Sequence, residues 1–224
     1  MPGPLGILML ETGFTRPPGD IGNPASFTFP VLYEVAAGAS ASRVVRDRAA
    51  GLLEPFIEAG ERLVERGAVG LMTSCGFLAL HQQTLAAALP VPVATSSLLQ
   101  LPLLERLLPK GQRIGVLTAS AEDLTAAHLA AVGAAADTPV AGLEPVGHFA
   151  TVLLGSGEPL DPERASADLF AAADRLRARH PTLGAILLEC TNMGPHTPAL
   201  ARHTGLPVFD VVGFAHWFHR GLCP

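Results

Sequence analysis

The chain alternates short apolar runs with longer Ala- and Leu-rich amphipathic stretches, and this alternation constrains its fold more than any other feature. The apolar runs predict buried strands at 5–10, 68–72, 91–95, 113–118, 185–189 and 207–212. The stretches between them predict helices at 43–66, 77–89, 97–108, 121–135, 161–179 and 195–204. Strands that are apolar throughout and separated by helices predict an α/β fold, with a parallel sheet covered by helices on both faces.

One helix start is especially well marked. Asp161 is a capping residue, Pro162 suits the first helical position, and Glu163 places a negative charge in the first turn. We therefore predict that a helix begins directly after Asp161.

The alternating pattern is also repeated along the chain. Cys75 and Cys190 each follow an apolar run, and each is followed 17 residues later by a Pro-Val pair that opens another run. The run LGILM (5–9) likewise matches IGVLT (114–118). We infer a duplication into two similar α/β domains. The first is expected to comprise residues 1–97 plus 208–224, and the second residues 98–207.

Composition narrows the classes of function. The chain has 224 residues, of which 49% are hydrophobic, and a formal net charge of −5. The absence of a basic stripe argues against a nucleic-acid partner, and no run reaches the ~18 apolar residues that span a membrane. With no signal-like segment at the start and three cysteines without a disulfide spacing, we expect a cytoplasmic protein with reduced thiols. The only lysine, Lys110, lies in a Pro/Gly connector, which disfavours pyridoxal phosphate chemistry.

The repeat directs two thiols toward one site. Ligands of parallel sheets bind at the carboxyl ends of strands, where Cys75 and Cys190 both lie. A helix N-terminus there is expected to lower the pKa of a thiol. One cysteine then serves as base and the other as acid, on opposite faces of a substrate carbon. Cys223 lies near the chain end without such surroundings, and we assign it no role.

Proton removal next to a carboxylate requires donors that stabilise the developing negative charge. The predicted strand ends supply such donors beside each cysteine and at the start of the second domain. The candidate substrate-binding residues are Thr73, Ser74, Gly76, Phe77, Thr118, Ser120, Thr191 and Asn192.

The segments TSCGF (73–77) and ECTNM (189–193), in a duplicated α/β chain, resemble the aspartate/glutamate racemase superfamily. The resemblance covers nearly the whole chain. It implies two pseudo-symmetric domains, each a roughly four-stranded parallel sheet flanked by helices, with the active site in the interdomain cleft. It also implies proton transfer between Cys75 and Cys190 without a cofactor, and a homodimer.

The expected function is a racemase or epimerase that inverts the α-carbon of a small carboxylate. One alternative is a one-cysteine decarboxylase or cis–trans isomerase of malonate- or maleate-type substrates, and another is a non-catalytic small-molecule binding module. Racemases acting on glutamate and aspartate carry Asn-Thr after the first cysteine, where this chain has Gly76-Phe77. Phe77 would make the pocket more apolar, which favours a different substrate.

The segment 11–30 predicts a long, proline-stiffened loop at the end of the first strand. We expect it to cover the cleft and to offer Asn23, Arg16 and Asp20 as candidates for contact with substrate. His216 and His219 lie three residues apart, but no third ligand has a supporting spacing, so no metal site is predicted.

Overall fold

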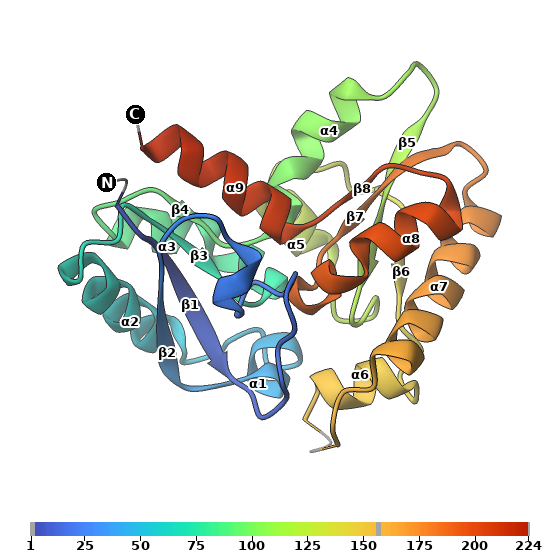
Figure 1. Cartoon of the computed structure of the whole chain (residues 1–224). Coiled ribbons are helices and arrows are strands. Elements are labelled where there is room, and N and C mark those ends of the chain that lie inside the picture. The colour runs from blue at the N-terminus through green and yellow to red at the C-terminus, as the bar shows by residue number, and fades with distance from the viewer. Residues whose placement is uncertain (1–2, 156–157, 224) are drawn as a thin grey trace.

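The computed structural model describes residues 3–155 and 158–223, and it confirms a two-part α/β fold (Figure 1). The first sheet contains β1 (Leu5–Glu11), β2 (Val31–Ser40), β3 (Gly70–Thr73) and β4 (Val93–Ala94) in the order β2-β1-β3-β4. The second contains β5 (Arg113–Thr118), β6 (Val140–Gly142), β7 (Leu183–Leu188) and β8 (Val208–Phe209) in the order β6-β5-β7-β8. All strand pairs are parallel. The two sheets therefore share one topology, as the repeat predicts.

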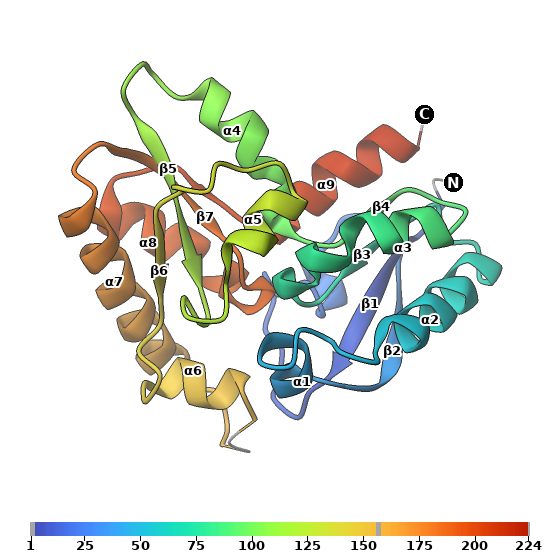
Figure 2. The ribbon, with the colours of Figure 1, turned by 180° about the vertical axis from the view of Figure 1, so that it is seen from behind.

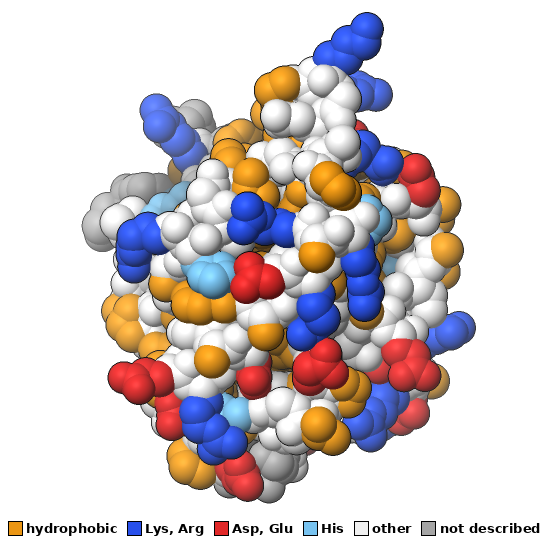
Figure 3. Space-filling model, turned by 90° about the vertical axis from the view of Figure 1, so that its right-hand side faces the viewer, with side chains coloured by type: hydrophobic (Ala, Val, Ile, Leu, Met, Phe, Trp, Pro, Cys, Tyr) orange, Lys and Arg blue, Asp and Glu red, His pale blue; other side chains and the backbone are white. Residues whose placement is uncertain are grey.

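Helices surround both sheets (Figures 1 and 2). The α-helices are α1 (Ala41–Val45), α2 (Leu53–Glu65), α3 (Gln82–Ala88), α4 (Leu101–Leu107), α5 (Ala126–Ala131), α6 (His148–Leu153), α7 (Pro162–Arg179), α8 (Thr197–Thr204) and α9 (Val211–Leu222). Short 3-10 helices are η1 (Pro24–Ser26), η2 (Gly76–His81), η3 (Ser97–Gln100) and η4 (Thr191–His196). On the face shown in Figure 3, basic and acidic side chains are interspersed among apolar ones.

One hydrophobic core is shared by the two halves. Leu8 and Leu71 of the first sheet belong to the same buried cluster as Val116 and Leu187 of the second. Helix α5 of the second half also packs against η2 of the first, where the rings of Phe77 and His128 meet edge to face with centroids 5.3 Å apart. Because this apolar surface is continuous, the two sheets are held in a fixed mutual position.

The C-terminal segment contributes a strand to the second half and a helix to the first. Val208–Phe209 form β8 and pair with β7 in the second sheet. Asp210 then caps α9, and its Oδ1 accepts a hydrogen bond from Gly213 N at 2.7 Å. Helix α9 packs on the first sheet, in a cluster that joins Phe214 to Ile7. The chain thus returns to the first half after β8, and the predicted strand over 207–212 was mostly wrong.

One further local prediction was wrong, and three elements were not predicted. The helix expected at 43–66 is broken into α1 and α2, because the chain turns through positive φ at Arg48, Ala49 and Gly51. Strands β2 and β6 were missed, since β2 is an edge strand with many half-exposed residues and β6 is only three residues long. Helix α6 was missed as well.

The predicted start of α7 is confirmed. Asp161 Oδ1 accepts hydrogen bonds from Glu163 N at 3.0 Å and Arg164 N at 3.2 Å, with Pro162 at the first helical position. These bonds also lower the pKa of the Asp161 carboxyl. Two backbone donors that the helix leaves free are thereby satisfied.

We expect Asp161→Ala to lower the free energy of unfolding, because it removes this cap. Urea denaturation followed by circular dichroism measures the change. Asp161→Asn, which keeps a capping oxygen, should retain most of the stability. Equal stability of the Ala variant and the wild type would contradict the assignment.

Candidate active site

Cys75 and Cys190 occupy equivalent positions in the two halves. Cys75 follows β3 and caps η2, and Cys190 follows β7 and caps η4. The residue before each cysteine bonds to the central strand of its own sheet: Ser74 N to Leu8 O at 2.9 Å, and Glu189 N to Leu117 O at 2.8 Å. Equivalent registers therefore bring both thiols to the carboxyl ends of their sheets.

The two thiols line one enclosed space, which we call the inner cavity. Five of the candidate substrate-binding residues line it, namely Ser74, Gly76, Phe77, Thr191 and Asn192. The other lining residues are Leu10, Thr12, Phe14, Arg16, Ala41, Val45, Ala119, Leu153, Leu154 and Glu189. A hydrogen bond of 2.7 Å from Thr191 Oγ1 to Ser74 O joins its two sides. Its accessible volume of about 30 Å³ suits one or two water molecules. Part of the lining must therefore move before a small carboxylate can enter.

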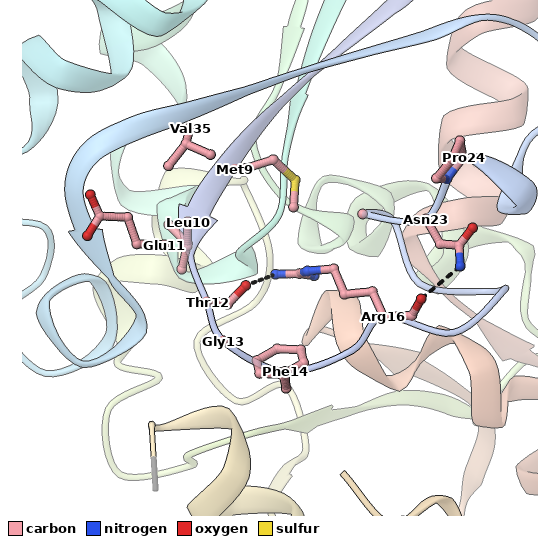
Figure 4. Close-up of a pocket in the computed structure, with 11 residues that line it drawn as sticks. Met9, Leu10, Glu11, Thr12, Gly13, Phe14, Arg16, Asn23, Pro24 and Val35 are labelled. Carbon is pink, nitrogen blue, oxygen red and sulfur yellow. Dashed lines mark hydrogen bonds between the residues drawn. The ribbon is translucent and has the colours of Figure 1, made fainter. Parts of the chain in front are cut away.

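A larger outer pocket of about 770 Å³ lies along the segment 12–23, which we call the covering loop (Figure 4). Thr12, Phe14 and Arg16 line both spaces. Asn23 lines only the outer pocket, where its Nδ2 donates a hydrogen bond to Arg16 O at 2.7 Å. Asn23 thus shapes the covering loop and stands outside the inner cavity.

A hydrogen bond from Asn192 joins the covering loop to the second half, and an ion pair within the loop holds the carboxylate that accepts it. Arg16 Nη1 lies 2.8 Å from Asp20 Oδ1, and its Nη2 donates to Thr12 Oγ1 at 3.0 Å. The guanidinium carbon lies 5.0 Å from the centroid of the Phe14 ring. The other oxygen of Asp20, whose side chain is 1% exposed, accepts a hydrogen bond of 2.7 Å from Asn192 Nδ2. Arg16, Asp20 and Asn192 therefore form a latch across the site.

The pKa values of both thiols are raised, whereas the sequence predicted that a helix N-terminus would lower them. Burial, followed by the nearby Glu189 carboxyl, raises the pKa of Cys75 to about 12 and that of Cys190 well above its ordinary value. The backbone N–H groups of Phe77 and Asn192 lower these pKa values, but each helix that follows is a short 3-10 turn. Desolvation of the thiolate outweighs the effect of the helix terminus, so the expected lowering was wrong.

The two thiols are not electrostatically equal. Arg16 acts to lower the pKa of Cys75, whereas Asp20 acts to raise the pKa of Cys190. Cys75 is therefore the thiol that ionises more easily of the two.

A buried carboxyl group that the sequence did not predict lines the inner cavity together with the two thiols. Glu189 is 0% exposed, and its Oε2 accepts a hydrogen bond of 2.7 Å from Thr118 Oγ1. Its Oε1 has no hydrogen-bond partner among the described residues. A Cβ atom on Gly76 would overlap Oε1, so only glycine fits beside Cys75. An acidic residue at the end of the apolar run AILLE was the signal that could have identified it.

The remaining candidates lie behind the cavity wall. Thr73 Oγ1 donates to Thr95 O at 2.6 Å, Thr118 binds Glu189, and Ser120 Oγ donates to Asp123 Oδ2 at 2.7 Å. None of these three side chains lines the inner cavity. Thr73 and Thr118 support residues that do line it, whereas Ser120 lines a separate surface pocket.

The two histidines considered as metal ligands pack against the N-terminal segments instead. His216 Nε2 lies 3.2 Å from Ser26 O, and His219 Nε2 lies 2.8 Å from Gly3 O. The ring of Phe29 stacks on His219 with centroids 3.8 Å apart.

Solved structures define the class to which this fold belongs. The crystal structure of arylmalonate decarboxylase aligns with a TM-score of 0.61 and 18% identity, covering 97% of this chain and 92% of its own. A glutamate racemase from Bacillus anthracis aligns with a TM-score of 0.59 and 14% identity, covering 98% of this chain and 83% of its own. At these identities the likeness concerns the fold, which is that of the aspartate/glutamate racemase-like enzymes.

Sequence relatives define the family more closely. A dimethylsulfoniopropionate lyase of Durusdinium sp. clade D is 32% identical over 226 residues, covering 97% of this chain and 74% of the relative. Dimethylsulfoniopropionate lyase 5 of Emiliania huxleyi is 30% identical, but the chain spans only 44% of its length. No family model matches the sequence. The chain belongs to the dimethylsulfoniopropionate lyase family.

Among residues 3–155 and 158–223, no helix has both the length and the apolar character required to cross a bilayer.

Glu189 makes stability depend on pH. Burial raises the pKa of its carboxyl to about 7, more than the hydrogen bond from Thr118 and the backbone N–H of Ala119 lower it. In the unfolded chain its pKa returns to the ordinary 4.5. Since the folded pKa is the higher one, the stabilising contribution is complete below pH 4.5 and is lost as the pH rises through 7.

We therefore expect Glu189→Gln to become more stable relative to the wild type, by about 3 kcal/mol, between pH 4.5 and pH 7.5. Denaturant titrations of both proteins across this range measure the difference. Glu58→Gln, at an exposed position of α2, is the control for an equal change of charge. A constant difference between Glu189→Gln and the wild type would contradict the raised pKa.

Proposed function

We propose that this protein is a lyase that cleaves a small carboxylate carrying a sulfonium leaving group, with dimethylsulfoniopropionate as the first candidate substrate. The observation that carries the proposal is the pair of thiols lining one cavity, in a chain that is 32% identical to a lyase of this name. The finer assignment of the reaction and substrate rests on this family membership together with the chemistry of the site.

The reaction suits a thiolate base next to a neutral partner. A thiolate at Cys75 removes the proton α to the carboxylate, the electron pair forms a carbon–carbon double bond, and the carbon–sulfur bond breaks. The sulfide leaves as a neutral molecule, and the thiol holds the proton. The leaving group needs no proton of its own, so Cys190 is free to remain a thiol and to donate a hydrogen bond to the substrate.

The surroundings of the thiols support the same step. The carboxylate gains negative charge as the proton leaves, and the backbone N–H groups that begin η2 and η4 lie next to the cysteines. Phe14 and Phe77 give the cavity aromatic lining, and aromatic faces attract organic cations.

A racemase remains the second candidate, since two thiols at equivalent ends of a duplicated fold suit the inversion of a stereocentre. Decarboxylation or cis–trans isomerisation would require only one of them. A non-catalytic binding module is the least favoured candidate, because both thiols line one cavity in a chain of an enzyme family.

We expect Cys75→Ala to abolish the release of dimethyl sulfide, because it removes the base. Cys190→Ala should lower kcat by about 10²-fold, and Cys190→Ser should recover part of this loss because a hydroxyl still donates a hydrogen bond. Gas chromatography of the headspace and NMR detection of acrylate measure the reaction. Cys223→Ala, far from the inner cavity, is the matched control. Full activity of Cys75→Ala would exclude the proposed base.

A lyase and a racemase can be distinguished by their action on chiral amino acids. In deuterated water, a racemase exchanges the α-hydrogen of a chiral amino acid and inverts its configuration, with equal need for both thiols. We expect neither exchange nor inversion for a panel of single-enantiomer amino acids followed by NMR. Inversion without any sulfide release from dimethylsulfoniopropionate would favour the racemase instead.

A further inference from the structure

A lyase of the proposed kind must dispose of one proton in every turnover, and this inference rests on that proposed function. Elimination moves the α-proton of the substrate to a thiolate, and no later step returns it to the product. The next turnover requires the thiolate again. A racemase has no such need, because the second thiol replaces the proton that the first removes.

Glu189 is placed to receive this proton. Besides the two thiols, the ionisable side chains that line the inner cavity are Glu189 and Arg16, among the residues that the structure describes. Arginine stays protonated in proteins and cannot accept a proton. Its charge is moreover committed to Asp20, at 2.8 Å, in the latch.

The orientation of the carboxyl leaves one oxygen free on the side of Cys75. Thr118 Oγ1 holds Oε2 at 2.7 Å, whereas Oε1 has no hydrogen-bond partner within the described parts of the chain. Oε1 lies against Gly76, the residue that follows Cys75. A buried oxygen without a partner is costly, so a purely structural group would be expected to satisfy both oxygens.

The internal repeat shows what the fold itself needs at this position. Ser74 is the counterpart of Glu189 in the first half, because each precedes its cysteine and bonds to the central strand. The hydroxyl of Ser74 accepts a hydrogen bond of 2.9 Å from Leu10 N. A small hydroxyl thus suffices in one half, and the second half carries an ionisable carboxyl in its place.

We propose that Glu189 accepts the proton that Cys75 takes from the substrate, and releases it to water when the covering loop opens. The sulfur–hydrogen bond of Cys75 breaks, its electron pair stays on sulfur as the thiolate, and the proton binds Oε1 of the Glu189 carboxylate. Glu189 acts through Cys75 and does not touch the substrate in this scheme.

Burial raises the pKa of Cys75 to about 12, so the transfer of its proton to Glu189 is uphill while the site is dry, and release of the proton to water completes it. Burial raises the pKa of Glu189 to about 7, so the carboxyl can change its protonation near neutral pH. The groups that face it across the site are Cys75 and Cys190, with Arg16 and Asp20 of the covering loop beyond them. Since the carboxyl and the thiols interact, the observed ionisations belong to the group as a whole.

The test is the pH dependence of sulfide release from dimethylsulfoniopropionate by the full chain. In the wild type, kcat should rise as the pH increases through about 7, because Glu189 must be ionised to accept a proton. Glu189→Gln should lower kcat by about 10²-fold, leave KM within a few fold, and abolish this rise. Glu189→Asp, which keeps a carboxyl, should retain the rise and part of the rate.

A second variant keeps the proposal falsifiable if Glu189→Gln folds poorly. Thr118→Val removes the hydrogen bond that lowers the pKa of Glu189, so the inflection in kcat should move to higher pH. A merely structural role would leave the inflection in place.

The outcomes separate this proposal from the one on which it rests. An active wild type with an unchanged pH profile in Glu189→Gln, or in Thr118→Val, overturns the role of Glu189 alone. A wild type that releases no sulfide at any pH overturns the lyase assignment, and the role of Glu189 with it.

Discussion

The structure depends on one constraint, which is that two parallel sheets end at the same place. In each half the central strand binds the backbone of the residue before the cysteine, at Ser74 and at Glu189. A shared apolar core then fixes the two sheet ends against each other. The positions of both thiols follow from strand register and packing, and not from any loop conformation.

The burial that this arrangement imposes sets the chemistry. Two thiols and a carboxyl are removed from water together, and each has its pKa raised because its charged form is desolvated. Such a cluster is costly to the fold and holds its groups protonated until a substrate or a change of pH intervenes. Arg16 and Asp20 then distinguish the two thiols, which a symmetric duplication alone would leave equivalent.

Closure of the site is carried by the covering loop. Arg16 pairs with Asp20 and contacts Phe14 within the loop, and the hydrogen bond from Asn192 then joins the loop to the second half of the chain. With an accessible volume of about 30 Å³, the inner cavity is too small for the proposed substrate. Entry through the outer pocket would require the latch to open, which couples substrate binding to movement of Arg16.

The sequence by itself predicted parallel sheets in two similar halves and placed the two cysteines at strand ends, because strands buried on both faces must be apolar and the spacing repeats. It did not predict the edge strands β2 and β6. It also placed the covering loop over the site. Only the tertiary structure decided which residues line the inner cavity. Ser120 and Asn23 were candidates and do not line it, whereas Glu189 was not a candidate and does. The pKa values of the thiols likewise could not be predicted from the residues next to them in the sequence. They depend on burial and on charges brought near through space, and residues as distant in the chain as Asp20 and Asn192 meet only after folding.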